Sequence, residues 1–169
     1  LLDGAMFLER QGITYHFVDK SYIRESHTNK NYVLPNSIHG HVVKVNFVGA
    51  KKNPQIFRSR IAPHYENYFV GNDSSKWASN VRIYNEVIYS EMYPNIDFKI
   101  YEKSTNMKYD FIVKPGGNTR DITIQYTGAD KLFVENNNLY IQTSLTDIIE
   151  NKPFAYQLIE GEKIEVPCS

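Results

Sequence analysis

Two histidines separated by one residue are the sharpest metal-like pattern in the sequence. His39 and His41 flank a glycine, and residues i and i+2 of a β-strand point to the same face of a sheet. A third ligand could come from His64 or Asp97, since zinc takes three or four protein ligands. No carboxylate or cysteine stands close to the pair in the sequence. Two solvated histidines at the start of a strand are therefore the alternative interpretation.

A polar turn at residues 71–75 offers oxygen atoms that could hold calcium. Its sequence, Gly-Asn-Asp-Ser-Ser, lacks the alternating acidic spacing of a dedicated calcium loop. The competing interpretation is that Asn72 and Asp73 bond to backbone amides of their own turn. Asn72, Asp73 and Ser74 also match a glycosylation sequon. We expect no cofactor, and calcium at this turn is the alternative left open.

Asp97 and Asp110 could be the paired carboxylates of a glycosidase, because they fall on neighbouring predicted strands. A catalytic acid needs a pocket that raises its pKa. The predicted pairing instead places Asp110 opposite Lys99 on an outward face, which favours an exposed ion pair. Cys168 is the single cysteine, so no disulfide forms within the chain, and no histidine stands near it as a base. We expect no enzyme.

Several large aromatic side chains could form a flat platform for sugar rings, because such side chains are rigid and amphipathic. They are equally suited to the core or the rim of a sandwich, and core or rim is the preferred interpretation for Trp77. Tyr101 is the better candidate for exposure, since it shares an outward face with Lys99. The candidates are Trp77, Tyr84, Tyr89, Tyr93 and Tyr101.

The alternation of apolar and polar residues predicts a β-hairpin that positions many of these side chains. Residues 96–101 and 108–113 both alternate with the period of a half-buried strand. Folding the chain about a loop at residues 103–106 gives one register that serves both faces. In this register Ile96, Phe98 and Ile100 lie opposite Val113, Phe111 and Tyr109, and Lys99 lies opposite Asp110.

Short strand-like segments bounded by turn residues recur along the rest of the chain. No segment keeps a 3.6-residue period over three turns. A single helical turn at 74–78 could begin at Asp73 or Ser74, which are acceptable N-caps. Residues 19–38 are predicted as a surface loop and 55–66 as a connecting stretch. Asn136–Asn138 are predicted as a hairpin turn, because asparagine tolerates positive φ better than most residues. In the strand predicted at 41–48, Val43, Val45 and Phe47 alternate onto one face. The other predicted strands are 5–9, 13–18, 41–48, 67–70, 81–89, 122–126, 132–135, 139–142, 146–150, 154–159 and 163–166.

About a dozen short strands with frequent turn signals predict an all-β fold, an antiparallel β-sandwich. The 169 residues fit one domain, spanning 1–169. The 19 basic and 19 acidic residues are interleaved and balance to zero net charge, which argues against a nucleic-acid partner. No apolar run approaches the roughly 20 residues that span a bilayer, so we expect no membrane insertion.

Several motifs follow one another in a specific order along nearly the whole chain. They include Asn67-Tyr68-Phe69-x-Gly71-Asn72-Asp73, Tyr93-Pro94-x-Ile96-Asp97, Tyr109-Asp110-Phe111-x-Val113-x-Pro115-Gly116 and Lys152-Pro153-x-Ala155-Tyr156-Gln157. This order resembles an uncharacterised N-terminal β-rich domain of secreted, Bacteroidetes-type bacterial surface proteins. In those proteins the domain precedes β-propeller repeats, PKD-like modules, or the C-terminal domains of gliding motility and type IX sorting.

The resemblance implies export and display at the outer cell surface, and it brings no catalytic residues with it. Chains of this kind carry further strands on both sides, so we expect the domain here to lack a strand at each end. The preferred function is a non-catalytic extracellular module with a structural, display or adhesion role. Its expected partners are neighbouring domains of the same chain, surface glycans or other cell-surface proteins. The alternatives are a carbohydrate-binding module that uses Trp77, Tyr84, Tyr93 and Tyr101, and a glycan-active enzyme with Asp97 or Asp110 as the acid.

Overall fold

The structure is a computed structural model that describes residues 2–29, 31–104 and 106–168. The chain divides into two compact units, of which unit 1 comprises residues 1–46 and 126–169 and unit 2 comprises residues 47–125. The described residues form thirteen strands, one short α-helix and two 3₁₀ turns. The strand pairings whose register the structure defines are all antiparallel. The predicted all-β class is therefore confirmed.

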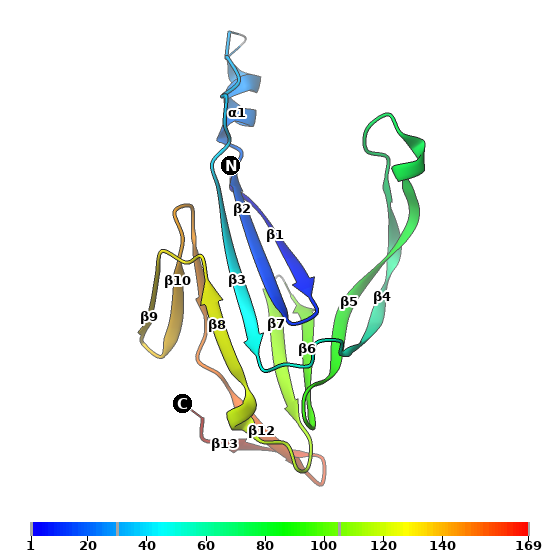
Figure 1. Cartoon of the computed structure of the whole chain (residues 1–169), viewed down its shortest axis with the longest axis vertical. Coiled ribbons are helices and arrows are strands. Elements are labelled where there is room, and N and C mark those ends of the chain that lie inside the picture. The colour runs from blue at the N-terminus through cyan, green and yellow to red at the C-terminus, as the bar shows by residue number, and fades with distance from the viewer. Residues whose placement is uncertain (1, 30, 105, 169) are drawn as a thin grey trace. The chain divides into compact units, whose positions relative to one another are not determined.

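Three sheets contain the strands of unit 1, and the first of them also includes the adjoining residues 47–48 and 123–125 (Figure 1). In the first, the strand order is β1 (Leu2–Glu9), β2 (Gly12–Asp19), β3 (Gly40–Val48) and β8 (Thr123–Thr127). The second sheet has the order β11 (Asp147–Glu150), β10 (Asn138–Gln142) and β9 (Lys131–Glu135), and the third pairs β12 (Ala155–Ile159) with β13 (Glu162–Val166).

Local sequence accounts for the strands of unit 1. Val43 and Val45 are buried on one face of β3, whereas Lys44 between them is exposed, so the predicted alternation is confirmed. The turn between β9 and β10 places Asn136 and Asn137 at φ 50° and 63°. Asparagine tolerates this left-handed conformation better than most residues, which confirms the predicted asparagine turn.

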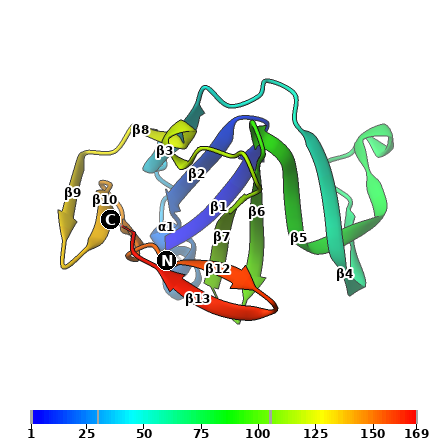
Figure 2. The ribbon, with the colours of Figure 1, turned by 90° about the horizontal axis from the view of Figure 1, so that it is seen from below.

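Unit 2 contains one four-stranded sheet with the order β4-β5-β6-β7 (Figure 2). Its strands are β4 (Gln55–Tyr68), β5 (Ala78–Tyr93), β6 (Ile96–Lys103) and β7 (Asn106–Val113). The register predicted for the central hairpin is confirmed at every pair, with Ile96 opposite Val113, Phe98 opposite Phe111, Ile100 opposite Tyr109 and Lys99 opposite Asp110.

The core of unit 2 is an aromatic cluster around Phe98, which is 1% exposed. The Phe98 ring lies 4.7 Å from the ring of Phe47 and 5.2 Å from that of Phe111, between ring centroids. Tyr89 and Tyr109 complete the cluster, each at 5.8 Å. Such tilted aromatic pairs are each worth about 0.5–1.5 kcal/mol beyond the area they bury. The alternation along β6 therefore aims its largest side chain at the centre of the unit.

The structure corrects two predictions. The predicted loop at 19–38 contains helix α1 (Ser21–Thr28), which has no buried residue and so left no apolar period in the sequence. The predicted connecting stretch at 55–66 is most of β4. Pro63 and a register shift between Ile61 and Tyr65 interrupt this strand, and most of it is exposed, so the sequence shows no clean alternation there.

Unit 2 also carries a two-stranded extension, here called the β4–β5 ribbon and comprising residues 61–84 (Figure 1). The pairing of β6 with β5 runs from Glu86 to Tyr93, so within this sheet the ribbon strands pair only with each other. A tip loop, residues 69–77, joins them. It contains the short 3₁₀ helix Ser74–Lys76, and the Asp73 side chain accepts a hydrogen bond from the Ser75 backbone N–H. The predicted helical turn with an Asp73 cap is thereby confirmed.

Replacement of the central core ring tests the aromatic cluster. We expect Phe98→Ala to lower the free energy of unfolding by about 3–5 kcal/mol, because it removes a buried ring and leaves a cavity. The matched control is Phe57→Ala on β4, where the ring is 53% exposed and the expected loss is below about 1 kcal/mol. Urea denaturation followed by near-UV circular dichroism measures both. Equal losses would show that Phe98 is not the centre of the core.

Two glycines with similar backbones separate steric contact from backbone strain. Gly128 and Gly161 have φ of 92° and 88°, so alanine is strained at both. A Cβ at Gly128 would lie 2.4 Å from the Val42 carbonyl oxygen, whereas nothing lies within 4 Å of one at Gly161. We expect Gly128→Ala to cost about 1–3 kcal/mol more than Gly161→Ala in urea denaturation. Equal costs would rule out a close approach of the two backbones.

Candidate functional site

The two predicted metal histidines meet at a serine of unit 1. The His41 Nε2 atom lies 2.7 Å from the Gly128 carbonyl oxygen, so this nitrogen donates a hydrogen bond. Its Nδ1 atom then accepts from the Ser144 backbone N–H at 3.2 Å and lies 2.9 Å from Ser144 Oγ. His39 Nε2 lies 3.4 Å from the same Oγ. Both nitrogens of the His41 ring are thus committed to bonds that join β3 to two turns.

No third metal ligand joins these histidines. Within residues 2–29, 31–104 and 106–168, no group of three or more His, Cys, Asp or Glu side chains gathers in a way that could hold a metal ion. The tautomer fixed by Gly128 also directs the free electron pair of His41 at the Ser144 backbone N–H. The geometry therefore fits a structural role for His41, whose hydrogen bonds link β3 to the turns at Gly128 and Ser144. Neither of the ligands considered with the pair, His64 and Asp97, joins it in such a group.

The other predicted metal site, Asn72 and Asp73, lies in the tip loop. Asp73 Oδ1 accepts from both the side chain and the backbone of Ser75, at 2.7 and 3.1 Å, and Oδ2 lies 3.5 Å from Lys76 Nζ. The Ser75 hydrogen bonds lower the pKa of the Asp73 carboxyl, with a smaller contribution from Lys76. Both oxygens already have partners, so a calcium ion would have to displace Lys76. Calcium at this turn stays a prediction.

The two carboxylates considered for glycan cleavage each have a basic partner in unit 2. Asp97 Oδ1 accepts from Lys114 Nζ at 2.7 Å and from the Glu91 backbone N–H at 2.8 Å, and the Asp97 side chain is 15% exposed. Partial burial works to raise the pKa of this carboxyl, but these two contacts outweigh it and lower the pKa. Asp110 pairs with Lys99 at 3.5 Å, across the strands as predicted. A general acid needs a raised pKa, which is opposite to the lowered pKa of Asp97.

Two residues of the predicted aromatic platform belong to the core. Tyr93 is 2% exposed, packs against Phe111 at 6.5 Å between ring centroids, and donates a hydrogen bond to the Thr123 carbonyl oxygen at 3.2 Å. Tyr89 is equally buried and packs against Phe98. Burial raises the pKa of both phenols. Their apolar bodies fill the centre of unit 2, so neither can take part in an exposed platform.

Two further tyrosines of the predicted platform are half-buried beneath cations. The Lys99 Nζ atom lies 4.7 Å from the centroid of the Tyr101 ring, and the Tyr101 hydroxyl lies 3.5 Å from Asp110 Oδ1. The Arg58 guanidinium lies 5.4 Å from the centroid of the Tyr84 ring. Each cation interacts with a ring face that a sugar would need. Tyr84 and Tyr101 therefore present less stacking surface than their positions in the sequence suggested.

Trp77 is the member of the platform that is clearly exposed. Its side chain is 44% exposed at the end of the tip loop, so of the predicted core or rim positions the core is excluded. The Trp77 Nε1–H donates to the Gly71 carbonyl oxygen at 3.2 Å, and the Phe69 ring meets the indole edge-on at 5.4 Å and 71°. Val70, next to Phe69, is also exposed. The tip loop therefore holds an indole ring in a defined position with part of it in solvent.

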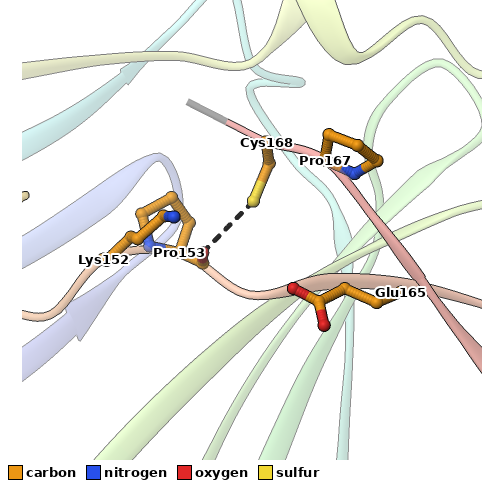
Figure 3. A pocket seen from close by; sticks show the side chains of 5 residues that line it. All are labelled: Lys152, Pro153, Glu165, Pro167 and Cys168. Carbon is orange, nitrogen blue, oxygen red and sulfur yellow. Dashed lines mark hydrogen bonds between the residues drawn. The ribbon is translucent and has the colours of Figure 1, made fainter.

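Cys168 lines a shallow hollow of about 430 Å³ in unit 1 (Figure 3). The other lining residues are Lys152, Pro153, Glu165 and Pro167. The Cys168 thiol donates a hydrogen bond to the Pro153 carbonyl oxygen at 3.1 Å, as the dashed line in Figure 3 shows. This contact holds the chain after β13 against the segment before β12. An incidental thiol therefore stays the interpretation of Cys168.

A cluster of two tyrosines and a glutamate in unit 1 has no counterpart in the sequence patterns. The Tyr126 hydroxyl donates to Glu150 Oε2 at 2.9 Å. Burial, together with the negative charge of Glu150, raises the pKa of the Tyr15 phenol to about 12. Tyr15 therefore keeps its proton at physiological pH. Because three different strands supply these residues, no local spacing could have revealed the cluster.

These features define an all-β protein in which His41, Asp97 and Asp110 make structural contacts and Trp77 is exposed at the tip of a ribbon. The chain belongs to the family described as "Domain of unknown function (DUF7948)", whose model matches residues 1–169. The predicted resemblance to an uncharacterised domain over the whole chain is confirmed to that extent. No curated protein and no solved structure matches the chain. No helix of the described residues is long and apolar enough to cross a membrane.

Substitution of the two carboxylates tests their structural roles. We expect Asp97→Asn to lower the free energy of unfolding at pH 7 by about 1–3 kcal/mol, because the Asp97 carboxylate accepts two hydrogen bonds and is largely buried. Asp110→Asn, the matched control, should cost below about 1 kcal/mol, since this ion pair is more exposed.

The pH dependence gives the sign of the Asp97 contribution. The folded-state pKa of Asp97 lies below its usual value of 3.8, so its contribution is complete at neutral pH and is lost as the pH falls through the folded-state pKa. The difference between wild type and Asp97→Asn should therefore narrow in acid. Urea titrations between about pH 7 and pH 2 measure it. A difference that widens in acid would contradict the lowered pKa.

Proposed function

We propose that this chain is a non-catalytic extracellular module of a larger bacterial cell-surface or secreted protein, with a structural, display or adhesion role. The observation that carries the proposal is the contrast between its charged and its apolar side chains. Asp97 and Asp110 each pair with a lysine. Asp73 caps a 3₁₀ turn, and both ring nitrogens of His41 form hydrogen bonds. Apolar side chains, by contrast, are exposed along the β4–β5 ribbon.

The arrangement of Asp97 and Asp110 supports a role without catalysis. A glycosidase needs one carboxylic acid that keeps its proton near neutral pH. Asp97 has a lowered pKa, and Asp110 faces Lys99 across the hairpin. Both carboxylates form ion pairs within unit 2. A glycan-active enzyme is therefore a weaker proposal than a binding or structural module.

The β4–β5 ribbon supports a role in contact with other molecules. Exposed apolar side chains that contact one another, as Phe69 and Trp77 do, can mark an interaction site on a soluble protein. The ribbon and its tip loop expose Ile61, Tyr65, Phe69, Val70 and Trp77. The partners we propose are neighbouring domains of the same chain, surface glycans or other cell-surface proteins.

Carbohydrate binding is the second candidate, and the exposure of Trp77 favours it. Of the four tyrosines and one tryptophan that the sequence suggested, Trp77 alone combines a fixed ring with substantial exposure. A sugar-binding role would make the module an adhesion domain rather than a spacer. It is compatible with the proposed extracellular position.

The location of the full-length protein tests the proposed function. We expect an antibody raised against residues 1–169 to label intact cells of the source organism, because the module would be displayed outside the envelope. Immunofluorescence before and after permeabilisation measures this, with a cytoplasmic protein as the control. Labelling that requires permeabilisation would contradict an extracellular role.

The same proposal expects the purified chain to leave polysaccharides intact. A reducing-end assay over a broad polysaccharide panel should give no signal above that of a heat-denatured sample. New reducing ends that appear with wild type and disappear with Asp97→Asn or Asp110→Asn would replace the proposed function with a glycan-active enzyme.

A further inference from the structure

We propose that the tip loop of the β4–β5 ribbon binds a neutral sugar ring, which stacks on the exposed surface of Trp77. The proposal rests on the adhesion role proposed above and names the ligand class for it. The binding group is the indole ring, and amide and hydroxyl groups of residues 67–80 would contact the sugar hydroxyls. The reasons lie in how the ring is held, in the charge of the loop, and in its unpaired polar groups.

The position of Trp77 gives it little to do in folding. Residues 78–85 of β5 pair with β4 alone, so the end of the ribbon has no third strand beside it within its sheet. The described side chains of residues 63–80 are all exposed to the degree typical of surface residues. A large apolar ring in such a place costs solvation without filling a core. Phe69 is the ring that contacts it, and this contact leaves Trp77 44% exposed.

The loop fixes the orientation of the indole before any ligand arrives. The Nε1–H bond to the Gly71 carbonyl and the edge contact with Phe69 hold the ring from two directions. Asp73 caps the 3₁₀ turn that leads into Trp77. Because the only polar group of the indole is already bonded, the group that Trp77 can offer a ligand is its apolar surface. A preorganised ring loses little conformational entropy on binding.

The charge of the loop selects a neutral ligand. Asp73 and Lys76 are the charged residues of residues 69–77, and they pair with each other at 3.5 Å. A phosphate or nucleic-acid ligand would need a surplus of basic groups, and so would an anionic lipid surface. The tip loop provides none. A neutral, polyhydroxylated ring with an apolar face satisfies both the aromatic surface and the absence of net charge.

Unpaired amides provide the polar contacts that sugars require. The side chains of Asn72 and Asn80 have no hydrogen-bond partner among the described residues. Each amide offers two donors and an acceptor, which match the vicinal hydroxyls of a pyranose. The Asn67 side-chain oxygen accepts a hydrogen bond from the Asn80 backbone N–H, and this bond fixes the strand next to Trp77. Asn72 and Asn80 lie within five residues of Trp77 in the chain, so we assign their amides to the hydroxyls of the sugar unit that stacks on the indole.

The geometry also limits the strength of binding. Phe69 stands at 71° to the indole, so the two rings cannot stack on the same flat ligand. One stacked ring with a few hydrogen bonds supports a dissociation constant of about 1 mM. Affinity of this order becomes useful when many copies of a module meet a repeating polymer. A surface glycan or polysaccharide is therefore a better match than a free monosaccharide.

The intrinsic fluorescence of the protein provides a direct test, because Trp77 is its one tryptophan. The full chain is titrated to about 50 mM with methyl glycosides of glucose, galactose, mannose and N-acetylglucosamine, and with their short β-linked oligomers. We expect at least one series to give a saturable change in tryptophan emission. The glycoside concentration that gives half of this emission change should fall as the oligomer lengthens. Vesicles of neutral phosphatidylcholine form a separate arm of the experiment.

Variants assign the response to the tip. Isothermal titration with the responding oligomer should show about a tenfold or greater loss of affinity for Trp77→Ala, and partial retention for Trp77→Phe. Asn72→Ala should weaken binding less than Trp77→Ala does. The matched control is Tyr156→Ala, an exposed aromatic on β12 that should leave binding unchanged. Far-UV circular dichroism confirms that each variant keeps its strands.

Three results would overturn the sugar site: no saturable response to any glycoside, binding that survives Trp77→Ala, or a response to the vesicles alone. None of them bears on whether the full-length protein is displayed outside the cell, which immunofluorescence measures separately. Failure of the sugar site with intact surface labelling would leave a structural or protein-binding module. Failure of both would remove the proposed function itself.

Discussion

Four aromatic rings surround Phe98 at centroid distances between 4.7 and 5.8 Å, and this packing constrains the rest of unit 2. A slip of one residue between β6 and β7 would turn Phe98 toward solvent, because neighbouring side chains of a strand point to opposite faces. The same slip would separate Lys99 from Asp110, which lie opposite each other in the observed register. The apolar cluster thus determines where the charged side chains meet. The ion pairs follow from the packing and contribute little to it.

The β4–β5 ribbon extends beyond the aromatic core of unit 2. Beyond Tyr84 the two strands are held by their own hydrogen bonds, and the edge strand β4 is interrupted at Pro63 and twisted by a positive φ at Arg60. Proline and bulges at an edge discourage pairing with another chain. The ribbon is therefore protected against edge-to-edge aggregation although its apolar side chains are exposed. Protection of the backbone with exposure of side chains is the combination that a recognition surface needs.

The sequence predicted those parts of the fold that depend on neighbouring residues. Alternation along the β6–β7 hairpin is a local pattern, as are the asparagine turn at 136–137 and the Asp73 cap, and all three are confirmed. Helix α1 buries no side chain, so its sequence shows no helical repeat of apolar residues. Pro63 interrupts β4, so the sequence of β4 shows no clean strand alternation. The bonds from His41 to Gly128 and Ser144 join residues far apart in the chain, which no spacing rule could anticipate. For Trp77 the sequence left core and rim open, because a residue type alone does not show that the surrounding ribbon has no core.

The contrast between the core and the tip loop is the physical basis on which we propose that this chain combines a rigid sheet with a binding surface. Unit 2 uses its buried rings to fix a sheet, and that sheet carries a ribbon whose contacts depend on uncharged groups. Contacts through ring surfaces and amides are short-range, so each is weak until shapes meet, and salt screens them little. Weak contacts act in adhesion only when many are made at once. Display of many copies on a cell surface provides that multiplicity, so the proposed location and the proposed sugar site support each other through the same physical requirement.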